Sequence, residues 1–345
     1  MSHDATAAAI VAGETPDIDS MVEYWRATDA GARPKPETVA VLAALSATPF
    51  THERVVGFVR YVEETYPPID LPASDEAVNI VGTGGGPATF NISTTAAFVA
   101  AAAGAKVLKS GSPAFSSRAG SFDVLKVLGL AKAQSDEALA DCLETVGIGF
   151  APATGYAPIC RRLAVASMPL EFKMIGRFVN ALGPLICPYR TRGAVVGAAT
   201  PVLFDIIRTV SAEFGRSVLT VRAECGIDEF VSIGPMRVAW PDDAAPSIVD
   251  PEDLGLRRGR LDALAGGDVE HNARELKAIL NNEGGAQATE TVALNAAAVL
   301  CMSGHAADLG EGIARTREAI RTGAAARKLA DAQARASERS RRRVA

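Results

Sequence analysis

The sequence predicts an α/β fold, in which a small N-terminal helical domain precedes a larger α/β domain with a mainly parallel sheet. Three observations predict it. Apolar residues recur at helical spacing from Ile18 to Tyr66. A proline-rich run from Pro67 to Pro72 then separates this region from the rest of the chain. Beyond that run, short apolar segments alternate with helical ones, which is typical of helices that cover a sheet.

The individual elements follow from the same patterns. We expect strands at 77–81, 105–108 and 217–221, helices at 94–103 and 123–128, and helices again from 268 onwards. The predicted domains are residues 1–72, joined by helices from later in the chain, and residues 73–330. Residues 331–345 form an arginine-rich tail, for which we expect a solvated, frayed end.

Composition and charge exclude several classes of protein. The chain has 345 residues, 48% of them hydrophobic and 22% charged, which suits a globular protein of two domains. Its net charge is −5, which argues against a surface that grips nucleic acid. An anionic substrate would therefore need local hydrogen-bond donors.

The cysteines and the apolar segments indicate a cytoplasmic protein without a membrane partner. The five cysteines lie far apart, so neither a structural zinc site nor a disulfide framework is expected. The N-terminus lacks the basic and apolar regions of a secretory signal. The most apolar stretch, from Thr95 to Ala103, is about half the length that spans a bilayer.

A glycine-rich loop is the strongest local feature. Val81-Gly82-Thr83-Gly84-Gly85-Gly86-Pro87 follows a predicted strand, and Asn91-Ile92-Ser93-Thr94 opens the next helix. Glycines let a ligand approach the backbone, and the start of a helix offers free N–H groups to phosphate. The loop matches neither the Walker nor the dinucleotide fingerprint. A plain turn before a capped helix is the alternative.

A second donor-rich segment follows the next strand. Lys109-Ser110-Gly111-Ser112 leaves that strand, and Ser116-Ser117-Arg118-Ala119-Gly120-Ser121 precedes another helix. Hydroxyl, ammonium and guanidinium groups bind anions well. Two such loops at consecutive strand ends would lie side by side at the carboxyl edge of a parallel sheet.

An acidic segment completes the pattern. Glu224-Cys225-Gly226-Ile227-Asp228-Glu229 follows the strand at 217–221. Neighbouring carboxylates at a strand end can hold Mg²⁺, which often bridges to a phosphorylated substrate. A polar turn with solvated acids is the alternative, which the two phosphate-binding loops disfavour.

These segments together resemble the anthranilate phosphoribosyltransferase family. The similarity includes VGTGG, FNIST, AFVAAAAGAKVLKSG and SSRAGSFDVLKVLG, then FVNALGPLICP, ECGIDE and the C-terminal GGDVEHNARELKAIL. It extends from about Ile18 to Ala330. It implies the nucleoside phosphorylase/phosphoribosyltransferase type of fold, a homodimer, Mg²⁺, and phosphoribosyl pyrophosphate as the donor.

The resemblance also implies roles for single residues. It places the pyrophosphate of the donor on Gly82, Thr83, Gly84 and Gly85. It places the ribose phosphate and one Mg²⁺, with Ser93 as a metal ligand, on Asn91, Ser93, Thr94 and Lys109, with Ser117 and Gly120 nearby. Asp228 and Glu229 would hold a second Mg²⁺.

The acceptor site departs from the family pattern. Gly86 replaces an aspartate of the glycine loop, and Ser110 and Ser112 replace a histidine and an asparagine. Gly176 replaces the arginine that pairs with the carboxylate of anthranilate, and Arg177 is displaced by one position. We place Ser110, Ser112 and Arg177 at the acceptor. Glu171 is the candidate for a general base.

These departures favour an acceptor other than anthranilate, such as a hydroxyl or amine of an aminoglycoside-like metabolite. Three alternatives stay open at this point. One is an authentic anthranilate enzyme of tryptophan biosynthesis, one is a pyrimidine nucleoside phosphorylase-like enzyme, and one is a non-enzymatic relative that binds nucleic acid. The intact Ser93, Lys109 and acidic pair argue against the last of these.

Overall fold

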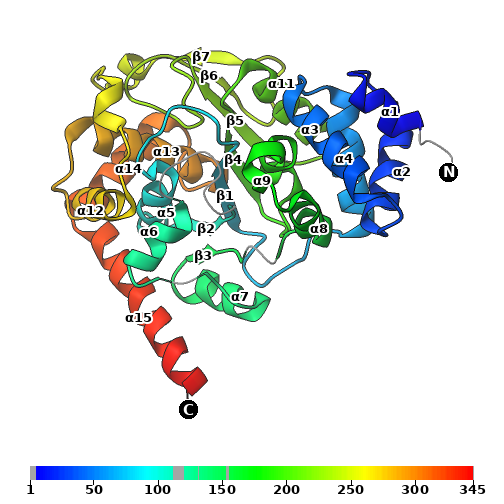
Figure 1. Ribbon diagram of the computed structural model, residues 1–345. Helices are drawn as coiled ribbons and strands as arrows, with labels where there is room; N and C mark the ends of the chain where they lie inside the picture. The colour runs from blue at the N-terminus through cyan, green and yellow to red at the C-terminus, as the bar shows by residue number, and fades with distance from the viewer. Residues whose placement is uncertain (1–4, 112–119, 131, 153–154, 345) are drawn as a thin grey trace.

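The computed structural model of the chain describes residues 5–111, 120–130, 132–152 and 155–344. A twisted sheet lies at the centre, helices cover both of its faces, and a group of helices at one side contains the N-terminus (Figure 1). The predicted fold class, a helical N-terminal domain with an α/β domain and a mostly parallel sheet, is confirmed.

The sheet of the described residues has seven strands in the order β3-β2-β1-β4-β5-β6-β7. Their bounds are β1 (Ala77–Gly82), β2 (Lys106–Lys109), β3 (Ile148–Phe150), β4 (Gly193–Gly197), β5 (Val218–Ala223), β6 (Met236–Ala239) and β7 (Ser247–Val249). Strands β1 to β5 pair in parallel, and β6 and β7 add an antiparallel edge. Because β1 and β4 are central and buried, their apolar residues run almost without interruption.

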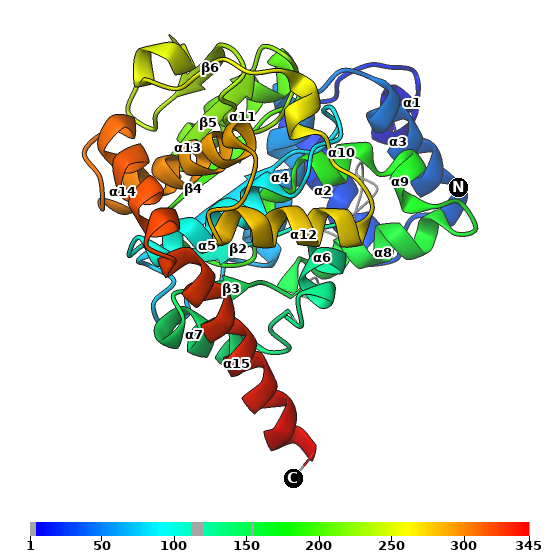
Figure 2. The same cartoon turned by 90° about the vertical axis from the view of Figure 1, so that its left-hand side faces the viewer.

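One face of the sheet carries helix α5 and the helices of the C-terminal part (Figure 2). These are α5 (Ile92–Ala102), α12 (Val269–Leu280), α13 (Ala286–Ser303) and α14 (Leu309–Arg321), followed by α15 (Ala324–Val344). Helix α15 extends away from the body in both views. Helix α6 (Ser121–Val127) and the short turns η3 (Pro251–Leu254) and η4 (Leu261–Leu264) pack on the same face. Helix α7 (Asp136–Thr145) packs on the other face, where Leu139 and Leu143 contact Leu108 of β2.

The other face packs against α11 (Pro201–Glu213) and the N-terminal helices. Helices α1 (Ala5–Val11), α2 (Ile18–Asp29), α3 (Lys35–Ala47) and α4 (His52–Thr65) share one core with α8 (Pro158–Ser167), α9 (Phe172–Ile175), α10 (Arg177–Ala181) and η2 (Gly183–Ile186). Phe178 is fully buried in this core and contacts the rings of Trp25, Phe50 and Phe58. It therefore connects α10 to the N-terminal helices.

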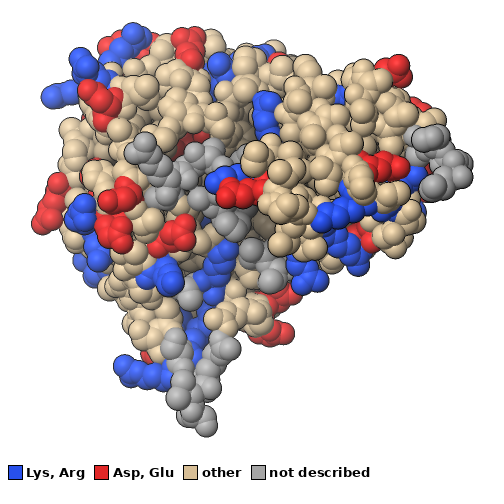
Figure 3. Space-filling model, in the orientation of Figure 1, with Lys and Arg blue, Asp and Glu red and all other residues tan. Residues whose placement is uncertain are grey.

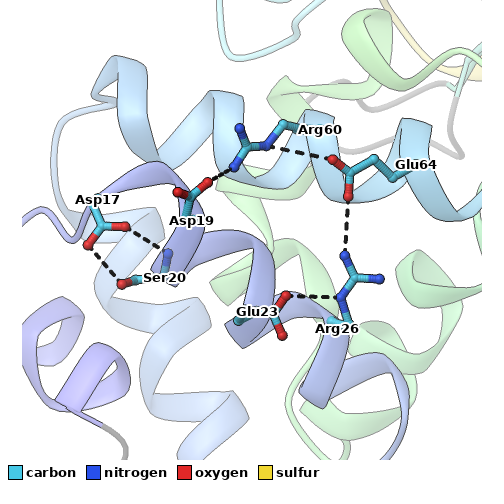
Figure 4. A network of polar contacts seen from close by, with 7 residues as sticks. All are labelled: Asp17, Asp19, Ser20, Glu23, Arg26, Arg60 and Glu64. Carbon is cyan, nitrogen blue, oxygen red and sulfur yellow. Dashed lines mark hydrogen bonds and ion pairs between the residues drawn. The ribbon is translucent and has the colours of Figure 1, made fainter.

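A polar network on the surface joins α2 to α4 (Figure 4). Arg60 of α4 pairs with Asp19 of α2 and with Glu64, and Glu64 also pairs with Arg26 at 3.2 Å. Asp17 caps α2 by accepting from the Ser20 backbone at 2.9 Å. The pairs are exposed, so each contributes at most about 1 kcal/mol, and the apolar core supplies most of the stability here.

The predicted strands and helices form at the expected places, with ends shifted by a few residues. The basic residues beyond 331 continue helix α15, and Arg335 pairs there with Asp141. The division of the chain at residues 72 and 330 stays a prediction. Within the described residues, no helix combines the length and the apolar character needed to cross a membrane. Acidic and basic side chains are interspersed over the face shown in Figure 3, with other residues between them.

Phe178→Ala should lower the free energy of unfolding by about 3–5 kcal/mol, because it leaves a cavity among the rings of a packed core. Denaturant titration followed by tryptophan fluorescence measures the change, and Phe178→Leu, which keeps most of the volume, should cost clearly less. A loss below about 1 kcal/mol for the alanine variant would show that α10 does not depend on this contact.

Candidate active site

A cavity of about 780 Å³ lies at the carboxyl ends of the central parallel strands. The segments that follow β1, β2 and β5 supply one set of its lining residues, and α8, α9 and α10 supply another. This is the edge at which ligands bind in parallel sheets, because the loops after the strands converge there. The sequence therefore places its glycine-rich, basic and acidic segments around one space.

The glycine loop follows β1 as predicted. Gly84 and Gly85 have φ values of +71° and +93°, a backbone conformation that other residues adopt rarely. A Cβ at Gly82 would lie 2.2 Å from Asp228 Oδ2, and one at Gly86 would lie 2.5 Å from the Gly226 carbonyl oxygen. A side chain at position 86 would therefore clash with the acidic segment, which lies directly against the loop.

Asp228 is hydrogen-bonded to the backbone of this loop. The N–H of Gly84 donates to Asp228 Oδ2 at 2.7 Å. Burial raises the pKa of Asp228, and the Gly84 hydrogen bond opposes that rise. The carboxylate thus occupies an N–H group of the kind that binds phosphate at a glycine-rich loop.

Glu229 makes the equivalent contact at the start of helix α5. The N–H of Ser93, one of the first free N–H groups of the helix, donates to Glu229 Oε1 at 2.9 Å. Burial raises the pKa of Glu229, and the neighbouring Asp228 raises it further. Both carboxylates therefore accept hydrogen bonds from the segments predicted to bind phosphate.

Lys109 is buried between these groups at the end of β2. Its ammonium group donates to the Ile80 carbonyl oxygen and to Ser93 Oγ, both at 3.1 Å. Burial lowers its pKa, and the negative charges of Glu229 and Asp228 oppose the change. This part of the cavity gathers one cation, two carboxylates and backbone donors.

Ser110 is held by a residue that sequence reasoning missed. Asn79 of β1 donates to Ser110 Oγ at 2.8 Å, and the N–H of Ser110 donates to Asn79 Oδ1 at 3.1 Å. Both residues are buried. A polar residue inside the apolar strand AVNIVG was the available signal, because buried amides need partners.

The other end of the cavity is largely apolar. Tyr156, Ala164, Phe172 and Val179 line it together with Arg161. Gly176 lies behind this wall, where a Cβ would be 2.7 Å from the ring and the carbonyl oxygen of Phe172. An arginine at position 176 would therefore clash with Phe172.

Most residues predicted to bind the donor line the cavity: Gly82, Thr83, Gly84, Asn91, Ser93, Lys109, Gly120, Asp228 and Glu229. Gly85 and Thr94 do not belong to the lining, and the Thr94 hydroxyl is buried without a hydrogen-bond partner among the described residues. Ser112 and Ser117 lie outside the described residues. Asn91 Oδ1 accepts from Asn272 at 2.9 Å.

Of the residues predicted at the acceptor, Ser110 lines the cavity and Arg177 does not. Arg177 donates to the Ser46 carbonyl oxygen at 3.3 Å and lies over the ring of Phe50. Glu171, the candidate base, is exposed outside the lining and pairs with Lys173 at 2.6 Å. The contributions of Tyr156, Arg161 and Phe172 were not predicted, because no short motif contains them.

Comparisons with known proteins agree with this geometry. The sequence profile of the family described as "Glycosyl transferase family, a/b domain" matches residues 74–326. Anthranilate phosphoribosyltransferase of Thermomicrobium roseum is 37% identical over 93% of both chains. The enzyme of the same name from Methylorubrum populi is 39% identical over 84% of this chain and 86% of its own.

Solved structures show the same fold. The crystal structure of anthranilate phosphoribosyltransferase from Thermus thermophilus has a TM-score of 0.82 and 31% identity, and the match covers 96% of this chain and 99% of that one. The Saccharomyces cerevisiae enzyme in complex with PRPP and Mg has a TM-score of 0.79 at 24% identity, over 97% of this chain and 93% of that one.

The expected enzyme class, a phosphoribosyltransferase, is confirmed, and the expectation of a non-anthranilate acceptor is wrong. The relatives with 37–39% identity over most of the chain carry the name of the anthranilate enzyme. The expectation treated three replaced positions as the loss of a pocket, whereas the cavity has an arginine, Arg161, at a position that the motif does not include. The chain belongs to the anthranilate phosphoribosyltransferase family.

Proposed function

We propose that the protein transfers the 5-phosphoribosyl group of phosphoribosyl pyrophosphate to the amino group of anthranilate. The amino nitrogen forms a bond to C1 of the ribose, the bond from C1 to the pyrophosphate breaks, and the amino group loses a proton. The observation that carries the proposal is one cavity that is lined both by donor-rich loops and by a largely apolar set of residues from α8 to α10. A phosphorylated sugar suits the first, and an aromatic ring suits the second.

The donor would lie against the glycine loop and the start of α5. Gly84 and Ser93 offer backbone N–H groups, and Lys109 adds a buried positive charge. Asp228 and Glu229 now accept those N–H groups, so the donor would compete with them. The carboxylates would then be free to bind a cation that accompanies the donor.

The site fits Mg²⁺ bound together with the donor. No described part of the chain holds a cluster of three or more His, Cys, Asp or Glu residues that could bind a metal by itself. Mg²⁺ often takes one or two carboxylates and completes its shell with water and substrate phosphates. Asp228 and Glu229, with Ser93 beside them, would hold it, and it would neutralise charge on the leaving pyrophosphate.

The acceptor end departs from the family pattern, and we propose that this changes the binding residues and not the acceptor. Ser110 is tied to Asn79, and Gly176 is packed against Phe172. Position 176 therefore has no room for an arginine side chain. The homodimer and the cytoplasmic location stay predictions.

Phosphoribosyl pyrophosphate with Mg²⁺ should raise the melting temperature, because a ligand of the native state stabilises it by mass action, by about 2.7 kcal/mol at a hundred times its Kd. Differential scanning fluorimetry measures the shift. The same donor with a chelator should shift the melting temperature much less. No shift at millimolar donor with Mg²⁺ would contradict the donor site.

Asp228→Asn combined with Glu229→Gln should reduce kcat/KM for the donor at least about 100-fold, because the cation loses its carboxylates. The melting temperature should not fall, since neutral amides are buried at less cost than carboxylates. Glu224→Gln is the matched control, because Glu224 lies on the same segment, is exposed and does not line the cavity. Equal activity and Mg²⁺ dependence in the double variant and the control would rule out the metal role.

Pyrophosphate release should depend on anthranilate in steady-state kinetics, and the gene should support growth of a tryptophan auxotroph that lacks this step. Anthranilate offers the amine and the ring that the cavity fits. An aminoglycoside serves as the control acceptor and should give no release above background. Release with the aminoglycoside and none with anthranilate would reverse the proposal.

A further inference from the structure

The acceptor end of the cavity has a cation that the family motif does not include. Arg161 lines the cavity beside Tyr156, Ala164, Phe172 and Val179. Its side chain is exposed and makes no hydrogen bond or ion pair with any residue in the described part of the chain. A guanidinium group at an apolar wall can bind a carboxylate through two parallel hydrogen bonds.

The geometry of helix α8 aims Arg161 at the cavity. Pro158, Arg161 and Ala164 follow one another at intervals of three residues and all line it. Arg162, about 100° further round the helix, faces the N-terminal helices and pairs with Asp29 at 2.5 Å. The two adjacent arginines thus point in different directions: Arg162 contacts Asp29 of α2, and Arg161 faces the cavity.

Other cations near the acceptor end are committed elsewhere. Lys109 lines the cavity too, but it is buried against Ile80 and Ser93 at the donor end. Arg177 is turned to Ser46 and Phe50. Position 176 cannot take an arginine without a clash with Phe172. Within the described lining, Arg161 is therefore the cation that an acceptor carboxylate can reach.

We propose that Arg161 binds the carboxylate of the aromatic acceptor and so determines its specificity. The inference rests on the proposed function, because it takes an aromatic carboxylate as the acceptor. In this arrangement the ring lies against Tyr156, Phe172 and Val179, and the amino group points to the donor end. The carboxylate-binding residue has moved from the segment before α10 to the first turn of α8.

Arg161→Gln should raise KM for anthranilate 10- to 100-fold, the range of a charge-assisted pair, with KM for the donor unchanged. Arg161→Lys should recover part of the loss, because it keeps the charge without the two-pronged geometry. Arg274→Gln is the matched control, since Arg274 is an exposed helical arginine outside the cavity. Titration calorimetry measures the binding of anthranilate and of anthranilamide, which has the same ring and amino group but no carboxylate. The comparison distinguishes the contribution of the carboxylate from that of the ring.

We expect Arg161→Gln to weaken the binding of anthranilate and to leave the binding of anthranilamide unchanged. A higher KM for the donor, with unchanged anthranilate binding, would assign Arg161 to a donor phosphate and overturn it. If the wild type uses anthranilate and Arg161→Gln equals the control, the inference fails while the proposed function stands. If the wild type neither binds nor uses anthranilate, the proposed function fails and the inference fails with it.

Discussion

The docking of two partly buried carboxylates on backbone N–H groups holds together the part of this site that we propose binds the donor. Asp228 accepts from Gly84, and Glu229 accepts from Ser93, so the acidic segment after β5 ties the glycine loop to the start of α5. Burial penalises both charges, and Lys109 offsets part of that cost. Glycine is required at 82 and 86 because a Cβ would clash with Asp228 at the first position and with the Gly226 carbonyl oxygen at the second. The site is thus arranged for anions in the positions that phosphates would take.

The acceptor end follows a different constraint, which is the packing of helices α8 to α10 against the N-terminal core. Phe178 fixes α10 from one side, and Phe172 closes the space at Gly176 from the other. A charged side chain cannot enter there, so a cation has to come from a neighbouring helix. We propose Arg161 for this role, because one face of α8 lines the cavity and another contacts the N-terminal helices.

The fold, and the meeting of the glycine-rich, basic and acidic segments around one cavity, could be predicted from the sequence because their signals are local. An apolar run followed by glycines, or by two acids, predicts a strand and also predicts that the loop after it lies at the carboxyl edge of the sheet. The acceptor end could not be predicted in this way. Arg161 and Tyr156 belong to no motif, and their place depends on how α8 packs. Arg177 was predicted at the acceptor, but as the first residue of α10 it is turned towards Ser46 and Phe50.

The most direct test of the account is a crystal structure with phosphoribosyl pyrophosphate and Mg²⁺, because it shows what the N–H groups of Gly84 and Ser93 bind when the donor is present. The account predicts that phosphate oxygens accept these hydrogen bonds, and that Asp228 and Glu229 leave them to face the cation. A complex in which both carboxylates keep their N–H partners and the donor lies elsewhere in the cavity would contradict it.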